Sequence, residues 1–147
     1  MAATVIGPPG DFPVIPASVQ GRPYSHAWML TMNPQMQGPP VVGGPVGAMF
    51  NMLLRLDFTG RPPQALALPP GSCFNEPVHI PPAGAGREGW LLAVVDSQTG
   101  PSEFEHALWI IDAGNLGAGP VAKAAIPHRL RPQVHGWWVG AAELQRA

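Results

Sequence analysis

Residues 90–96 read Trp-Leu-Leu-Ala-Val-Val-Asp, and residues 107–112 read Ala-Leu-Trp-Ile-Ile-Asp. Each stretch is apolar up to its closing aspartate, which predicts a strand that is covered on both faces. The same reasoning predicts further strands at 24–32, 51–57, 65–68, 76–80, 121–126 and 134–139. The strand centres recur about every 12–15 residues with turn signals between them, a spacing typical of an all-β sandwich, barrel or propeller.

The composition agrees with a chain of short apolar strands joined by many turns. The 147 residues include 18 glycines and 20 prolines, yet 46% are hydrophobic and only 12% are charged. The charged share is about half of the usual ~25%, which argues against a solvated, disordered chain. Two strands end in Asp followed by a turn that closes with Gly, at 57–60 and 96–100. This weak repeat suits the hairpins of a β-propeller without excluding a sandwich.

Two segments are expected to lie outside this regular pattern. Residues 1–23 carry five prolines and are predicted to form an irregular lead-in, and residues 33–48 are predicted to form a Pro/Gly-rich surface loop. We otherwise expect residues 1–147 to form a single portion of one fold, since the length suits one domain.

Charge, cysteine count and hydropathy exclude several classes of partner. A net charge of −1 and scattered Lys and Arg residues give no basic stripe for nucleic acid. No apolar run approaches the ~20 residues that a membrane helix needs, and no secretory leader is apparent. A single cysteine, Cys73, excludes an internal disulfide framework and favours a cytoplasmic location.

The familiar catalytic and metal-binding motifs are missing from the sequence. The five histidines, at 26, 79, 106, 128 and 135, do not form a zinc-protease helix motif, and one cysteine cannot make a zinc ribbon. There is no nucleophile elbow and no phosphate-binding loop. Any chemistry must therefore come from a less common arrangement.

His135 and Glu76 are the candidates that the residues themselves suggest. His135 lies in Val134-His135-Gly136-Trp137-Trp138, where apolar neighbours and a glycine predict a dry site that the backbone can approach closely. It is either a core histidine or a metal ligand. Glu76 precedes Pro77 and either caps a turn or orients a metal-bound imidazole through its distal nitrogen.

Three blocks of sequence resemble the carotenoid oxygenase family, which includes lignostilbene dioxygenases, apocarotenoid oxygenases and the retinoid isomerase of the eye. The blocks are Asp11-Phe12-Pro13 with Gly21-Arg22-Pro23-Tyr24 and Ala27-Trp28; Asn75-Glu76-Pro77-Val78 with Glu88-Gly89-Trp90-Leu91-Leu92; and Ile111-Asp112-Ala113, Gly119-Pro120-Val121-Ala122, Pro127-His128-Arg129 and His135-Gly136 with Trp138. The third block is the most specific, and the resemblance extends over about residues 10–143.

The resemblance implies a seven-bladed β-propeller, of which this chain would supply about two to three blades. It implies iron(II) on the propeller axis, held by four histidines, three of which are oriented by glutamates. By position, His135 matches the last iron ligand, Glu76 matches one orienting glutamate, and Asp11, one methylene shorter, stands where a second is usual. The other three ligands have no match in this sequence.

The implied reaction of an intact enzyme splits a conjugated alkene with dioxygen into two carbonyl products. The substrate would be an apolar carotenoid, apocarotenoid or stilbene, in a tunnel that aromatic side chains line. The candidates for that lining, which core packing explains equally well, are Tyr24, Trp28, Trp90, Trp109, Trp137 and Trp138.

Because the sequence matches only one of the four iron-binding histidines, three hypotheses remain open. In the first, the chain is the C-terminal part of such a dioxygenase and neither binds iron nor cleaves substrate alone. In the second, a separate N-terminal polypeptide completes it. In the third, it is a β-rich interaction module without a metal.

Overall fold

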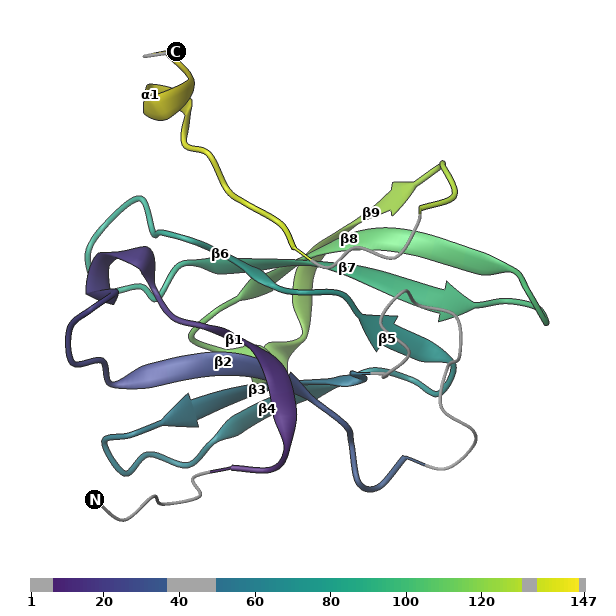
Figure 1. Cartoon of the computed structure of the whole chain (residues 1–147), viewed down its shortest axis with the longest axis horizontal. Helices are drawn as coiled ribbons and strands as arrows, with labels where there is room; N and C mark the ends of the chain where they lie inside the picture. Colours follow the sequence, from purple (N-terminus) through teal and green to yellow (C-terminus); the bar gives the residue numbers. More distant parts are fainter. Residues whose placement is uncertain (1–6, 37–49, 131–134, 146–147) are drawn as a thin grey trace.

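The computed structural model describes residues 7–36, 50–130 and 135–145 as two antiparallel β-sheets packed face to face (Figure 1). The first sheet has the strand order β1-β2-β3-β4, a simple meander. Its strands are β1 (Gly10–Val14), β2 (His26–Thr31), β3 (Met52–Asp57) and β4 (Gln64–Ala67). The second sheet has the order β5-β7-β8-β9, and β6 also pairs with β7. Its strands are β5 (Ser72–Phe74), β6 (Val78–Ile80), β7 (Trp90–Gln98), β8 (Phe104–Asp112) and β9 (Pro120–Ile126). The prediction of an all-β fold is confirmed.

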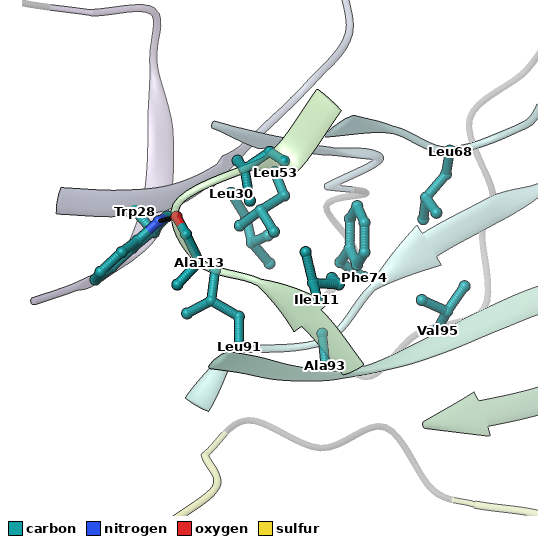
Figure 2. Close-up of a cluster of buried hydrophobic side chains, with 11 residues drawn as sticks. Trp28, Leu30, Leu53, Leu68, Phe74, Leu91, Ala93, Val95, Ile111 and Ala113 are labelled. Carbon is teal, nitrogen blue, oxygen red and sulfur yellow. Dashed lines mark hydrogen bonds between the residues drawn. The ribbon is translucent and has the colours of Figure 1, made fainter. Parts of the chain in front are cut away.

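The hydrophobic core lies between the two sheets. The predicted cover of β7 and β8 on both faces is not met, because buried residues of β7 alternate with half-buried ones and most of β8 is half-buried. Leu30 and Leu53 of the first sheet face Leu91 and Ile111 of the second, and all four are fully buried (Figure 2). The buried Trp28 indole donates a hydrogen bond to the carbonyl of Ala113 across the two sheets, at 2.9 Å. Burying the apolar surface of such side chains stabilises the fold by about 1.5–3 kcal/mol for each one.

A buried arginine also ties the sheets together. Arg55 of β3 donates to both carboxylate oxygens of Glu88, which precedes β7, at 2.8 and 2.6 Å, and to Asp57 at 3.1 Å. Burial opposes the charge, yet the bonds to Glu88 and Asp57 raise the pKa of Arg55. The guanidinium therefore stays charged and links the two layers.

The lead-in predicted for residues 1–23 is more regular than its prolines suggest. Gly10–Val14 form β1, and Ala17–Val19 form a short 3₁₀ helix, η1. The expectation of an irregular segment is wrong here because β1 is an edge strand, where Pro13 removes no ladder hydrogen bond that the sheet needs. Of the predicted loop at 33–48, only residues 33–36 belong to the described part of the chain, and residues 37–48 lie outside it.

The predicted strands at 76–80 and 134–139 also differ from the structure. At the first, β5 and β6 both pair with β7 and are separated by Asn75, Glu76 and Pro77. At the second, Val134 lies outside the described residues, and residues 135–139 are extended without pairing to a described strand. From there the chain leads away from both sheets to the short helix α1 (Ala141–Leu144) (Figure 1).

Candidate functional site

Glu76 lies in the break between β5 and β6, at the edge of the second sheet. Between the last residue pair of β5 with β7 and the first residue pair of β6 with β7, the chain that links β5 to β6 has three residues, Asn75 to Pro77. Over the same interval β7 has only two residues. Pro77 lacks a backbone N–H, so the ladder cannot run through it. Asn75 instead donates its backbone N–H to Val94 at 2.8 Å. The break places the Glu76 carboxylate, whose side chain is 20% exposed, beside the C-terminal segment.

The Glu76 carboxylate holds His135 through one of its oxygens. Its Oε2 atom lies 3.1 Å from Nδ1 of His135 and accepts the backbone N–H of Gly136 at 3.0 Å. A β-carbon at Gly136 would lie 2.8 Å from a methyl group of Val78, so the absence of a side chain permits this approach. The expected pairing of Glu76 with His135, and the close backbone approach, are both present.

The surroundings of His135 differ from the dry environment that its neighbours predict. Its side chain is 78% exposed. Trp137 is 82% exposed and Trp138 is 44% exposed, so the aromatic residues beside it do not cover the ring. With Nδ1 on Glu76, the Nε2 atom has no hydrogen-bond partner among the described residues and is the nitrogen available to a ligand.

Asp11, the second expected orienting carboxylate, makes a different contact. Its Oδ1 atom accepts the backbone N–H of the adjacent Phe12 at 2.8 Å. In the described part of the chain, no hydrogen bond joins it to an imidazole. The ring of Phe12, however, lies edge-on to His135, with 6.5 Å between the ring centroids. This contact of Phe12 and the Gly136 amide on Glu76 were not predicted, and no sequence motif signals either.

Two hollows flank the segment that carries His135. One, of about 160 Å³, lies against β7 and β8 and is lined by Val78, Leu92, Val94, Leu108, His135 and Trp138 among others. The other, of about 580 Å³, lies against β1 and η1 and is lined by Val14, Ile15, Glu76, Val78, Trp137 and Trp138 among others. Trp137 and Trp138 line both, so two of the predicted tunnel residues border apolar space. Trp28 instead belongs to the core.

The remaining histidines take part in other contacts. His106 lies 2.6 Å from a buried carboxylate oxygen of Asp96, and His79 lies 2.8 Å from the carbonyl of Glu88. The ring of His26 lies edge-on to the Trp28 indole, and the ring of His79 stacks on it. His128 is exposed.

The described residues do not form a complete metal site by themselves. They contain no cluster of three or more His, Cys, Asp or Glu side chains that could hold a metal ion. The donor set at this site is one imidazole nitrogen with a carboxylate on its other nitrogen, which is the usual arrangement of a metal-bound histidine. The described residues thus fit one coordination position of an iron site but not a whole site.

Comparison with known proteins identifies the family. The family model described as retinal pigment epithelial membrane protein matches residues 3–140. The chain belongs to the carotenoid oxygenase family. It is 33% identical to lignostilbene-α,β-dioxygenase isozyme III of Sphingomonas paucimobilis, over 91% of this chain and 27% of that protein. It is 27% identical to resveratrol cleavage oxygenase 1 of Chaetomium globosum, over 92% of this chain and 26% of that protein.

Solved structures of carotenoid oxygenases share the fold. The lignostilbene dioxygenase of Pseudomonas brassicacearum matches with a TM-score of 0.76 and 29% identity, over 89% of this chain and 27% of that one. A mutant of the Synechocystis apocarotenoid oxygenase matches with a TM-score of 0.72 and 23% identity, over 88% of this chain and 25% of that one. The chain therefore spans about a quarter of the length of these relatives. No helix in the described residues is long and apolar enough to span a membrane.

Proposed function

We propose that this chain supplies the C-terminal part of an iron(II)-dependent dioxygenase that cleaves a conjugated C=C bond of a stilbene, carotenoid or apocarotenoid. Within it, His135 is one iron ligand through Nε2, and Glu76 orients the imidazole. The observation that carries the proposal is the pairing of Glu76 with His135 and Gly136 across 59 residues of sequence. Membership of a family whose relatives are named stilbene and apocarotenoid oxygenases supports the reaction class.

The role of each residue follows from the contacts it makes. The Glu76 carboxylate would accept a hydrogen bond from the Nδ1–H of His135, which keeps the proton on Nδ1 and leaves the Nε2 lone pair free for a metal. The exposure of His135 leaves room for further ligands from polypeptide that is not in this sequence. Bound iron with open coordination positions would supply the oxygen chemistry. A cobalt-substituted form of the Synechocystis oxygenase, which shares the fold, supports a transition-metal site in the family.

The four-stranded sheet of β1 to β4 and the five-stranded sheet of β5 to β9 would then be two blades of a propeller. One histidine cannot hold iron specifically, so the chain alone is expected to retain no stoichiometric iron and to cleave no stilbene. A polypeptide that carries the missing blades and histidines would complete the enzyme, and the proposed location of the assembled enzyme is the cytoplasm.

A chimera tests this proposal directly. The chain replaces the aligned 27% of the Sphingomonas lignostilbene dioxygenase, and metal content and oxygen-dependent stilbene cleavage are measured. The chimera is expected to bind metal and cleave stilbene, His135→Ala to lose both, and Glu76→Gln to weaken metal affinity about 10–100-fold. His128→Ala, which removes an exposed histidine elsewhere, is the matched control and should be silent.

Two results would contradict the proposal. If His135→Ala leaves metal content and cleavage of the chimera unchanged, His135 is not a ligand, and an interaction module without a metal explains the chain better. If the purified chain alone retains near-stoichiometric iron and cleaves stilbene, the requirement for further polypeptide is wrong.

A further inference from the structure

We propose that Phe12 is a positioning residue for His135, and that the Asp11 carboxylate helps to hold the backbone of Phe12 in place. This inference rests on the proposed role of His135 as a metal ligand. It assigns to Phe12 a part in the site that neither the sequence motifs nor the comparisons give it.

The first observation is a β-bulge in β1 at Phe12. Asp11 pairs with Leu30 and Val14 pairs with Trp28, so β1 uses one more residue than β2 between the same two pairs. Phe12 has a φ of +52°, and no other non-glycine residue in the described part of the chain has a positive φ. A residue with a side chain is strained in this left-handed region, and such strain persists only where surrounding contacts hold it.

The second observation is the set of contacts that hold the bulge. The Phe12 backbone N–H donates to Oδ1 of Asp11 at 2.8 Å. The Phe12 ring packs edge-on against Phe50, with 5.7 Å between centroids, and contacts the buried core between the sheets. The bulge and these contacts together fix the orientation of the Phe12 ring against the core.

The third observation is the contact of the Phe12 ring with His135. His135 lies edge-on to this ring, at a centroid distance of 6.5 Å and an interplanar angle of 73°. A single hydrogen bond from Nδ1 to Glu76 fixes one atom of the imidazole, but the ring can still turn about its Cα–Cβ and Cβ–Cγ bonds within the reach of that hydrogen bond. A second contact, on the ring itself, restricts this rotation and so sets the direction in which Nε2 points.

The two possible roles of Asp11 are separable by substitution. Asparagine keeps an Oδ1 acceptor for the Phe12 N–H but has no negative charge. Alanine removes both. If Asp11 acts locally, Asp11→Asn resembles the unaltered chain and Asp11→Ala resembles a variant that lacks the Phe12 ring. If Asp11 acts through its negative charge instead, Asp11→Asn has the same effect as Asp11→Ala.

Nitrogen-15 NMR of the histidine rings in the full chain tests this without any metal. Phe12→Leu and Asp11→Ala are expected to shift the ring proton signals of His135 and broaden them, whereas Asp11→Asn leaves them in place. His128 in the same samples, and Phe58→Leu at an exposed phenylalanine, are the controls. The Trp28 indole N–H signal, which reports the bond to Ala113, shows that the core of each variant is intact.

Metal affinity of the lignostilbene dioxygenase chimera, measured with cobalt(II), gives the second readout. Phe12→Leu and Asp11→Ala are expected to lower it about tenfold, and Asp11→Asn less than twofold. Unchanged His135 signals and unchanged affinity in Phe12→Leu would overturn the inference, as would equal effects of Asp11→Asn and Asp11→Ala. If His135→Ala itself leaves metal binding unchanged, the proposed function fails instead, whatever the Phe12 variants do.

Discussion

Removal of the Arg55 guanidinium is expected to destabilise the chain strongly, because this group joins the two sheets. The Arg55 side chain is 3% exposed and makes three charge-assisted hydrogen bonds, two to Glu88 and one to Asp57. In Arg55→Met the apolar stem persists, but two carboxylates lose their partner. The variant thus isolates the charged head from the packing of the stem.

The size of the loss follows from what the carboxylates can do afterwards. Removing one partner of a buried ion pair costs about 3–5 kcal/mol, because the other charge stays behind without compensation. The Glu88 side chain is 27% exposed and can recover some hydration. Asp57 keeps other donors, since Oδ1 accepts from the backbone and hydroxyl of Thr59. We therefore expect the lower end of the range, about 3 kcal/mol.

Urea denaturation of the chain, followed by tryptophan fluorescence at pH 7, measures this loss. Arg87→Met is the matched control, because it removes the same charge from an exposed residue next to Glu88 and should change the free energy of unfolding by less than about 0.5 kcal/mol. The double variant Arg55→Met/Glu88→Gln should lose less free energy of unfolding than the two single variants lose together. A loss for Arg55→Met no larger than that for Arg87→Met would refute the view that this bridge joins the sheets.

Two further predictions concern pH and backbone approach. Burial lowers the pKa of His26 below 6.5, against the pull of the Glu88 carboxylate, so the folded chain binds fewer protons than the unfolded one just below pH 6.5. The stability that neutral His26 contributes should be fully present above pH 6.5 and be lost as the pH falls through the pKa of the folded chain. The urea midpoint of His26→Gln should therefore change less between pH 7 and 5 than that of the unaltered chain. An identical change in both proteins would contradict this. Gly136→Ala must displace Val78 and should speed amide exchange at residue 136, with little change in unfolding free energy, whereas Gly84→Ala, which meets open space, should leave that exchange unaltered.

The strands that could be predicted from sequence are those whose apolar side chains fill the core. β7 and β8 were expected at 90–96 and 107–112, and the structure extends β7 to Gln98 and starts β8 at Phe104. Most of the added residues are polar, and one of them, His106, is buried beside Asp96, so apolar patterning does not mark the ends of these strands. β1 could not be predicted, because an edge strand tolerates the proline and the polar residues that sequence rules exclude from strands.

The pairing of Glu76 with His135 was predictable only through the family motif. Taken alone, a carboxylate before proline predicts a turn cap as readily as an orienting group. What decides between them is the break between β5 and β6, and that break depends on how Phe74 and Val78 both find partners on β7. Such long-range pairing leaves no local pattern in the sequence, and neither does the contact of Phe12 with His135.

The local structure around His135 is hard to explain by stability. An exposed ion pair contributes about 0–1 kcal/mol, and the His135 side chain is 78% exposed, so its bond to Glu76 holds little of the fold together. Yet three costly features meet at this ring: a phenylalanine in the left-handed region, a strand broken at Pro77, and a glycine with no room for a side chain. Natural sequences tolerate such departures from local preference mainly at functional sites. If His135 is an iron ligand as proposed, the direction of its Nε2 atom is what these three features would serve.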